Sequence, residues 1–226
     1  YFGNQGVWCH DLDGKLIWSK KFDPMPTQFG WGTAASPILH ENRLIIVNDN
    51  EKDSFMVCFD KKDGKELWKL KRDEKSNWAT PFVWKNEQRT EIVTAGAKKI
   101  RSYDLDGKLL WELGGMSNIT IPTPFTRHGL LYVGSGYILG KNKPVFAIKP
   151  GAKGDITLKE NETNNEYIAW CQKDAGPYNP SFLVYGDYLY VLYDRGFLAC
   201  FNAKTGKPVY EKQRLEGLFT ASPWAY

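Results

Sequence analysis

The residues Cys9, His10, Asp11 and Asp13 bring a thiol, an imidazole and two carboxylates close together in the sequence. Groups of these types bind transition metals or carry acid–base and nucleophilic catalysis. The same pattern of positions returns along the chain, however, and its later copies do not keep this combination of groups. The copies run from Cys58 to Trp68, from Ser102 to Trp111 and from Cys200 to Tyr210, with an interrupted copy from Ala147 to Trp170. Each residue of the first copy is therefore interpreted as filling a structural position.

The cysteines of these copies favour packing over redox chemistry. Cys9, Cys58 and Cys200 share their position with Ser102 and Ala147, so the position requires a small buried residue. Equivalent positions on packed sheets lie about 10 Å apart, which is too far for a disulfide. His10 shares its position with large aromatic residues in the other copies and is expected to be packed. Cys171 stands outside the pattern.

The centre of each copy predicts a tight turn between two strands. An aspartate accepts hydrogen bonds within the turn, a glycine adopts positive φ, and an aromatic residue follows on the next strand. Both faces of that strand carry apolar residues, which is expected where neighbouring sheets cover both faces. The aromatic ring would then fill the gap between two sheets. The residues of this docking motif are Asp11, Gly14, Trp18, Asp60, Gly64, Trp68, Asp104, Gly107, Trp111, Trp170, Gly206 and Tyr210.

A second repeated signal is a small residue followed by proline, at Pro37, Pro81, Pro124, Pro180 and Pro223. The successive spacings are 44, 43, 56 and 43 residues, and fixed periods of this size indicate a repeat architecture. The additional residues of the third interval fall in the polar segment 149–167. We expect this segment to be a surface loop or a hairpin extension.

Each period contains four short strand patterns separated by turn residues, which is the blade of a β-propeller. The 226-residue chain is therefore predicted to be a single all-β domain of four-stranded antiparallel blades, about five blade equivalents in all. Both ends fall within a strand, which favours an arc of a larger ring over a closed five-bladed ring. The expected units are 1–32 (second to fourth strands only), 33–76, 77–119, 120–175, 176–218 and 219–226 (first strand only).

The Asp-x-x-Gly-Lys-x-x-Trp motif followed by a Ser/Thr-Pro strand resembles the pyrroloquinoline-quinone-like (PQQ-like) propeller repeat family, over essentially the whole chain. Segments 176–180 and 193–198 are similar to exported bacterial propellers, which implies a periplasmic or extracellular location and a ring of seven or eight blades. The family includes the outer-membrane-assembly lipoprotein, which has no cofactor. It also includes quinoprotein alcohol and sugar dehydrogenases.

The dehydrogenases of this family carry adjacent cysteines and a Glu/Asn/Asp calcium set, neither of which is found in the sequence. We therefore expect no catalytic residues, no metal and no cofactor. The alternative is a PQQ- and calcium-dependent dehydrogenase whose cofactor residues lie partly outside this chain. Segment 49–53 faintly resembles a calcium loop but has Ser54 where glycine is required, so a charged loop is expected. No helix is expected after Gly134 and Gly136, which argues against a dinucleotide site.

The loops that enter the first strand of each blade surround the mouth of the propeller axis and form the candidate binding site. Their aromatic and amide side chains suit a planar or sugar-like ligand, or else simply plug the axis. The candidate residues are Trp31, Asn77, Trp78, Asn118, Tyr178 and Asn179. The dispersed net charge of +4 argues against a nucleic-acid partner, and no apolar run is long enough for a membrane helix. The sequence thus predicts a monomeric, non-catalytic binding or scaffold propeller for a protein or carbohydrate partner.

Overall fold

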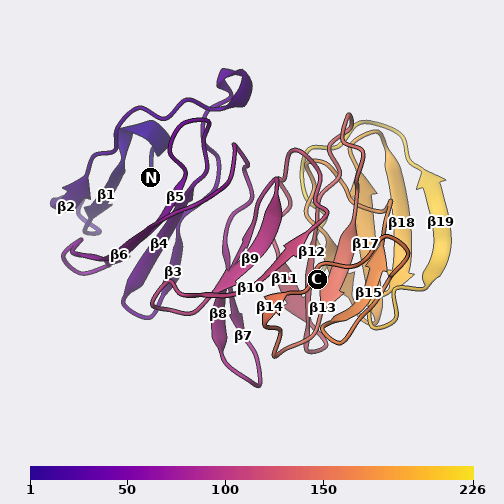
Figure 1. Ribbon diagram of the computed structural model, residues 1–226. Coiled ribbons are helices and arrows are strands. Elements are labelled where there is room, and N and C mark those ends of the chain that lie inside the picture. The colour runs from indigo at the N-terminus through magenta and orange to yellow at the C-terminus, as the bar shows by residue number, and fades with distance from the viewer.

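The computed structural model describes the backbone of residues 1–226 and every side chain except that of Glu211. Within this description the chain is all-β, with only two 3-10 turns, η1 (Gly3–Gln5) and η2 (Gln28–Gly30). A two-stranded hairpin is followed by four sheets. Each sheet contains four antiparallel strands, and the second sheet has a fifth strand that is parallel to its neighbour. The sheets follow one another in an arc from the N-terminal hairpin to β19 (Figure 1). This arrangement is a partial β-propeller, as the repeat predicted.

The hairpin and the sheets have the following strands, given from the inner to the outer edge of each. The hairpin is β1 (Val7–His10) and β2 (Leu16–Lys20). The first sheet is β3 (Ile38–His40), β4 (Arg43–Asn48), β5 (Phe55–Asp60) and β6 (Glu66–Lys71). The second is β7 (Phe82–Lys85), β8 (Thr90–Ala95), β9 (Lys99–Tyr103), β10 (Leu109–Gly114) and β14 (Gly154–Asp155). The third is β11 (Phe125–Arg127), β12 (Leu130–Gly134), β13 (Val145–Ile148) and β15 (Ile168–Gln172). The fourth is β16 (Leu183–Tyr185), β17 (Tyr188–Tyr193), β18 (Phe197–Asn202) and β19 (Pro208–Arg214).

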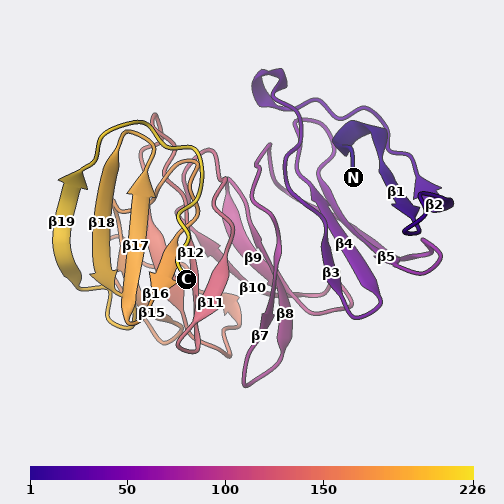
Figure 2. The same ribbon diagram turned by 180° about the vertical axis from the view of Figure 1, so that it is seen from behind.

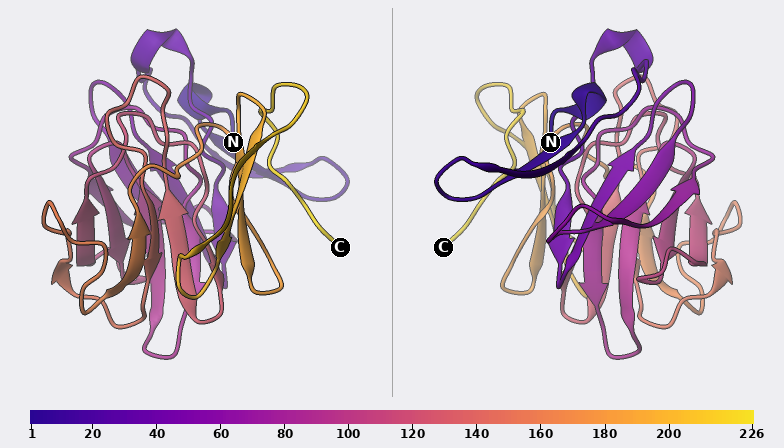
Figure 3. Two further views of the ribbon diagram at one scale, coloured as in Figure 1. Left: turned by 90° about the vertical axis from the view of Figure 1, so that its right-hand side faces the viewer. Right: turned by 90° about the vertical axis from the view of Figure 1, so that its left-hand side faces the viewer.

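The first strands of the sheets lie along the inner side of the arc. Strand β7 contacts both β3 and β11, and Figure 2 shows these strands and β16 toward the middle of the molecule. Figure 3 shows the N-terminal hairpin and the C-terminal residues extending toward the same side. The segments that connect one sheet to the next lie at one end of the sheets, the upper end in Figure 1, together with the turns between second and third strands. We call this end the loop face.

Two strands expected at the ends of the chain are not formed. Residues before β1 contain only the turn η1, so the first unit is a hairpin of third and fourth strands and lacks the predicted second strand. Residues 219–226 pair with no other strand of the described chain, although they were expected to be a first strand. A strand requires a hydrogen-bonded neighbour, and neither segment has one here. The exact limits of the repeat units stay a prediction.

The docking motif has the predicted turn geometry. Asp11 Oδ1 accepts hydrogen bonds from the backbone N–H groups of Asp13 and Lys15, at 3.0 and 2.8 Å, and Asp104 makes the equivalent pair. Asp60 Oδ1 accepts one from Lys62, at 2.8 Å. The motif glycines all adopt positive φ, at 81°, 72°, 85° and 70° for Gly14, Gly64, Gly107 and Gly206.

The register of the strands explains why the sequence requires a small residue before each turn. Cys9 pairs with Trp18, Cys58 with Trp68, and Ala147 with Trp170 across the third and fourth strands. Ser102 faces Trp111 and Cys200 faces Tyr210 in the same way. A small side chain opposite the aromatic ring leaves room for the ring to lean toward the next sheet. All four cysteines are free thiols.

Trp111 departs from the docking geometry of the other tryptophans. Its Nε1 donates to Glu91 Oε2 at 2.7 Å within its own sheet, instead of to a carbonyl of the next sheet. The inserted segment occupies the place of the next docking turn: Ala152 and Ile156 pack with Trp111 in one buried cluster. The segment also adds β14 as a parallel fifth strand beside β10. Most of the segment is exposed, as its polarity predicted, but Ala152, Ile156 and β14 anchor it to the second sheet.

A row of hydroxyl groups links the inner edges of neighbouring sheets. The backbone N–H of Ser36 donates to Thr80 Oγ1 at 3.0 Å, and that of Thr123 donates to Ser181 Oγ at 3.1 Å. The N–H of Ser181 donates in turn to Ser222 Oγ at 2.9 Å. In the fourth sheet, Ser181 and Phe182 thus occupy the positions of a Ser/Thr-Pro pair. The prediction that Pro180 occupies the proline position is wrong by two residues. The motif selects a hydroxyl because that hydroxyl joins two blades.

The fourth strands are less covered than their apolar residues suggested. Ile17 and Leu67, which alternate with Trp18 and Trp68, are 55% and 41% exposed. The tryptophan side of these strands contacts the following sheet, whereas the opposite side is partly open to solvent. The prediction that both faces are covered is wrong at these two positions.

Candidate functional site

The most prominent feature of the loop face is the connection between β2 and β3, which stands above the sheets at η2 (Figures 1 and 3). It carries Phe29 and Trp31, whose ring centroids lie 4.9 Å apart. Trp31 in turn packs on Trp78 of the next connection, at 5.5 Å. Phe29 and Trp31 are 66% and 53% exposed, whereas Trp78 is buried. We call Phe29, Trp31 and Trp78 the aromatic platform.

Hydrogen bonds fix the platform to the loops beneath it. Trp78 Nε1 donates to the carbonyl of Gly32 at 2.8 Å, and the N–H of Gly32 donates to Thr27 Oγ1 at 2.8 Å. The N–H of Gln28 donates to Ser76 Oγ at 3.0 Å, and that hydroxyl donates to Glu51 Oε1 at 2.7 Å. An exposed loop held at both ends in this way presents its rings in a fixed orientation.

Phe29 has a left-handed backbone conformation, with φ at 56°. For a bulky residue this conformation is strained, and strain of this kind is found where the surrounding structure imposes it. The conformation turns the Phe29 ring toward Trp31 and away from the core, so the strain serves to display an apolar ring on the surface.

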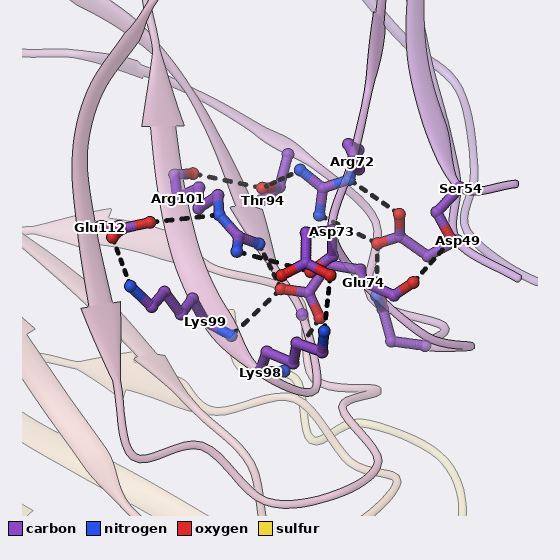
Figure 4. A network of polar contacts seen from close by, with 12 residues as sticks. Asp49, Ser54, Arg72, Asp73, Glu74, Thr94, Lys98, Lys99, Arg101 and Glu112 are labelled. Carbon is purple, nitrogen blue, oxygen red and sulfur yellow. Dashed lines mark hydrogen bonds and ion pairs between the residues drawn. The ribbon is translucent and has the colours of Figure 1, made fainter. Parts of the chain in front are cut away.

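Asn77 lies under the platform and is fully engaged inside the protein. Its Nδ2 donates to Asp49 Oδ2 at 2.5 Å. The same carboxylate accepts two hydrogen bonds from the buried guanidinium of Arg72, at 2.7 and 2.9 Å (Figure 4). Arg72 also donates to the hydroxyls of Thr94 and Tyr103 in the second sheet. Asn77 is thus buried and held against Asp49.

A second buried carboxylate continues this network between the first and second sheets. Glu74 is paired with Arg101 and accepts hydrogen bonds from the backbone N–H groups of Lys98 and Lys99, at 2.9 and 3.1 Å (Figure 4). Burial raises the pKa of Glu74 above its ordinary value, against the opposing influence of these N–H groups and of Arg72. The network satisfies buried charges within the protein and therefore holds two blades in register.

The other predicted residues form a second group on the loop face. Tyr178 packs on Tyr137 with ring centroids 5.2 Å apart, and burial raises its pKa. The backbone N–H groups of Tyr178 and Asn179 donate to the two oxygens of Asp194, at 3.1 and 3.0 Å. Asn118 is exposed in the connection between β10 and β11. The ring contacts thus join Trp31 to Trp78 and Tyr178 to Tyr137, at two separate places on the loop face.

The sequence did not predict the residues that hold these two aromatic contacts in place. Glu51 lies in a segment that seemed an ordinary charged loop, and Asp194 in one noted only for its resemblance to other propellers. Tyr137 follows Gly136 in the connection between β12 and β13, and its ring contacts Tyr178 in the connection between β15 and β16. The presence of an aromatic residue in both connections was the available signal for this contact. Hydrogen bonds from a loop to a distant backbone have no signature in the local sequence.

The described side chains were compared with the calcium set of the dehydrogenases. Among them, no cluster of three or more His, Cys, Asp or Glu residues could hold a metal ion. In the loop that resembles a calcium site, Asp49 is paired with Arg72, and Glu51 accepts hydrogen bonds from Ser76. His10 is exposed instead of packed, and His40 is buried in β3. We therefore derive no chemistry through such a group.

A cavity of about 860 Å³ lies beside the two-stranded hairpin. It lies between the hairpin and the first sheet and is lined by Trp8, Cys9, Ile17, Leu39 and Leu44 among others. Strand β1 pairs only with β2, so its other edge faces this space. In the complete sheets the inner strands occupy the corresponding position. His10 is exposed because it borders this cavity.

No helix in the described part of the chain is long and apolar enough to cross a membrane.

Comparisons with known proteins agree on the fold. BamB from Moraxella catarrhalis superposes with a TM-score of 0.61 and 15% identity, over 97% of this chain and 58% of BamB. A europium-containing methanol dehydrogenase gives a TM-score of 0.62 and 13% identity, over 92% of this chain and 47% of the enzyme. Quinohemoprotein alcohol dehydrogenase ADHIIG from Pseudomonas putida HK5 gives 0.60 and 13%, over 94% and 39%. The chain thus spans between about two fifths and three fifths of these proteins.

No curated protein sequence matches the chain. A family model described as outer membrane protein assembly factor BamB matches residues 3–166, which is more than half of the sequence. The matched residues include three docking motifs and the N-terminal hairpin of β1 and β2. The chain therefore belongs to the PQQ-like β-propeller repeat family that is represented by the outer membrane protein assembly factor BamB.

Proposed function

We propose that this propeller is a non-catalytic binding module that docks a protein partner on its loop face. The observation that carries the proposal is the aromatic platform: two exposed rings, Phe29 and Trp31, stacked on the buried Trp78. Aromatic residues in rigid settings are the usual energetic anchors of protein interfaces. Because the loop is already fixed by hydrogen bonds, docking would order few additional side chains.

The family supports a protein partner and a location outside the cytoplasm. The matching family model is that of an outer membrane protein assembly factor, and a factor of this kind acts on other proteins. The same kinship supports the proposal of a periplasmic or extracellular location. A carbohydrate ligand is the less favoured partner for the platform, because its rings stand on a projecting loop and not in a pocket. The protein is proposed to act as a monomer.

Site-directed photo-crosslinking in producing cells tests the proposal. A photoreactive phenylalanine analogue replaces Phe29 in the intact protein, and the same analogue replaces Leu109, which is 46% exposed at the start of β10. We expect a discrete crosslinked product from the first position and none from the second. Trp31→Ala should abolish the product while leaving the melting temperature nearly unchanged, because the Trp31 side chain is half exposed.

Equal products from both positions, or a product that survives Trp31→Ala, would contradict docking on the platform. Cell fractionation of the same cultures checks the location. The protein should be recovered with the periplasmic or secreted fraction.

The alternative is a quinoprotein alcohol or sugar dehydrogenase with cofactor residues partly outside this chain. The likeness in fold to a europium-containing methanol dehydrogenase is what keeps it in view. Titration of the intact protein with PQQ and calcium separates the two hypotheses. Saturable quinone binding at micromolar concentration, with turnover of an alcohol or sugar, would favour the dehydrogenase and contradict the non-catalytic module.

A further inference from the structure

A second cavity on the loop face is lined by glycine, aromatic and charged residues. It has a volume of about 270 Å³ and lies between the third and fourth sheets. Its walls are formed by Tyr178, Tyr193 and Phe197, and its rim by charged side chains. The volume is near the lower limit of small-molecule sites, so the cavity holds one ring and not a dinucleotide.

Two glycines line the cavity and have no room for a side chain. A side chain at Gly136 would begin 1.9 Å from the carbonyl oxygen of Gly176, and one at Gly176 would begin 2.1 Å from that of Ser135. The two backbones are thus in contact, and glycine is required at both positions. The Gly-Ser-Gly sequence, which makes no dinucleotide site, has its physical reason here.

Hydrogen bonds and ring contacts hold the aromatic walls. Tyr193 donates its hydroxyl to the carbonyl of Ala175 at 3.0 Å, and Lys212 Nζ lies 4.4 Å from the centre of the Tyr193 ring. The guanidinium of Arg214 lies 4.9 Å from the Phe197 ring and donates to the carbonyl of Arg195 at 2.7 Å. These contacts fix the rings without filling the space between them.

The charges around the cavity favour an anion. Lys143, Arg195 and Lys212 line it and form no ion pair with any described side chain. Of the two carboxylates present, Asp194 uses both oxygens to accept backbone N–H groups. Asp174 remains available as an acceptor for hydroxyl groups. Three cations therefore face two carboxylates, and the one with both oxygens engaged still carries its charge, so the side chains around the cavity have an excess of one positive charge.

We propose that this cavity binds a single anionic sugar ring. The flat faces of Tyr178 and Phe197 suit the C–H face of a sugar, the cations suit its carboxylate or phosphate, and Asp174 suits its hydroxyls. This ligand is separate from the protein partner proposed for the aromatic platform, and neither proposal depends on the other.

Isothermal titration calorimetry of the intact protein tests the proposal with sodium D-glucuronate, D-glucose 6-phosphate and D-glucose. We expect saturable binding of at least one anion at millimolar concentration, the range for a ligand of this size. Glucose should bind about tenfold more weakly or not at all, because it lacks the charge-assisted hydrogen bonds. A higher salt concentration should weaken the binding of the anion, since the cations at the rim are exposed to solvent. Comparison of the two anions tells whether the site prefers a carboxylate or a phosphate.

The double variant Arg195→Glu/Lys212→Glu should lose at least about tenfold in affinity for the anion. Lys108→Glu, an equally exposed lysine on a distant turn, is the matched control and should bind as the parent does. All of these positions are exposed, so the variants should fold, and circular dichroism checks this. Equal affinity for glucose and glucuronate, unchanged binding by the double variant, or no saturable binding of either anion would overturn the proposal.

Discussion

The indole of Trp170 packs against the Cα atom of Gly206 in the following sheet. A methyl group added at Gly206 would lie 2.6 Å from Trp170 Cδ2, and Trp170 Nε1 donates to the carbonyl of Ala203 at 2.9 Å. Trp18 with Gly64 and Trp68 with Gly107 repeat this contact. The glycine thus has two roles, because it permits the turn and also makes room for a ring from the preceding blade.

Replacement of Gly206 by alanine separates these two roles. Gly206→Ala should destabilise by the cost of a left-handed alanine, about 1–2 kcal/mol, plus about 1–3 kcal/mol of overpacking against Trp170. Gly14 adopts the same positive φ with no atom within 4 Å of an added methyl, so Gly14→Ala should show the first cost alone. Urea unfolding midpoints measure both. Equal losses would show that the ring contact is unimportant.

Loss of Arg72 should be among the most damaging single changes. The side chain is buried against Asp49, and its removal leaves that carboxylate unpaired. We expect Arg72→Leu to cost about 3–5 kcal/mol, and Arg72→Leu/Asp49→Leu to cost less than Arg72→Leu alone. Lys98→Ala breaks an exposed pair with Asp73 and should have much less effect on stability. A double variant less stable than Arg72→Leu would contradict this account.

The stabilising effect of Glu51 on the platform should depend on pH. Burial raises its pKa, but the hydrogen bonds from Ser76 and the charge of Lys75 outweigh this and lower the pKa below 4.5. A lowered folded-state pKa gives stability that is present above pH 4.5 and is lost as the pH falls through the folded value. Glu51→Gln should therefore be less stable at pH 7, by no more than about 1 kcal/mol because the group is partly solvated. The difference should shrink as the pH falls below 4.5 in thermal unfolding, and a constant difference would refute the assignment.

Two buried thiols should resist modification in the folded protein. Burial raises the pKa of Cys58 and of Cys171 to about 11, so only about one thiol in a thousand is ionised at pH 8. Maleimide labelling followed by peptide mapping should find neither residue modified until the protein is unfolded in urea. Rapid labelling of either in the native state would show that its blade opens readily.

The blade was predictable from sequence because its signals are local. Asp60, Gly64 and Trp68 lie within one hairpin, and each is required by the geometry of a turn or a neighbouring strand. Trp111 shows the limit, since the same motif is used differently where an insertion replaces its partner turn. Its actual partner, Glu91, is a charge in an apolar strand and was the available signal.

The candidate site was harder to predict because its residues are joined by contacts between blades. The sequence placed Trp31 and Trp78 in neighbouring loops correctly, but Asn77 looked equally available and is buried against Asp49. Whether an amide faces solvent or a buried carboxylate depends on residues many positions away. The cavity beside Tyr178 likewise depends on glycine backbones that meet across a sheet boundary.

The docked tryptophans also give the arc a direction. Trp18, Trp68 and Trp170 each bond to a carbonyl that follows them in the chain, at Lys61, Leu105 and Ala203. During synthesis a blade would therefore remain without its ring contact until the turn of the following blade has left the ribosome. Native packing would follow translation with a delay of about one blade, and its order would run from the N-terminal hairpin toward β19.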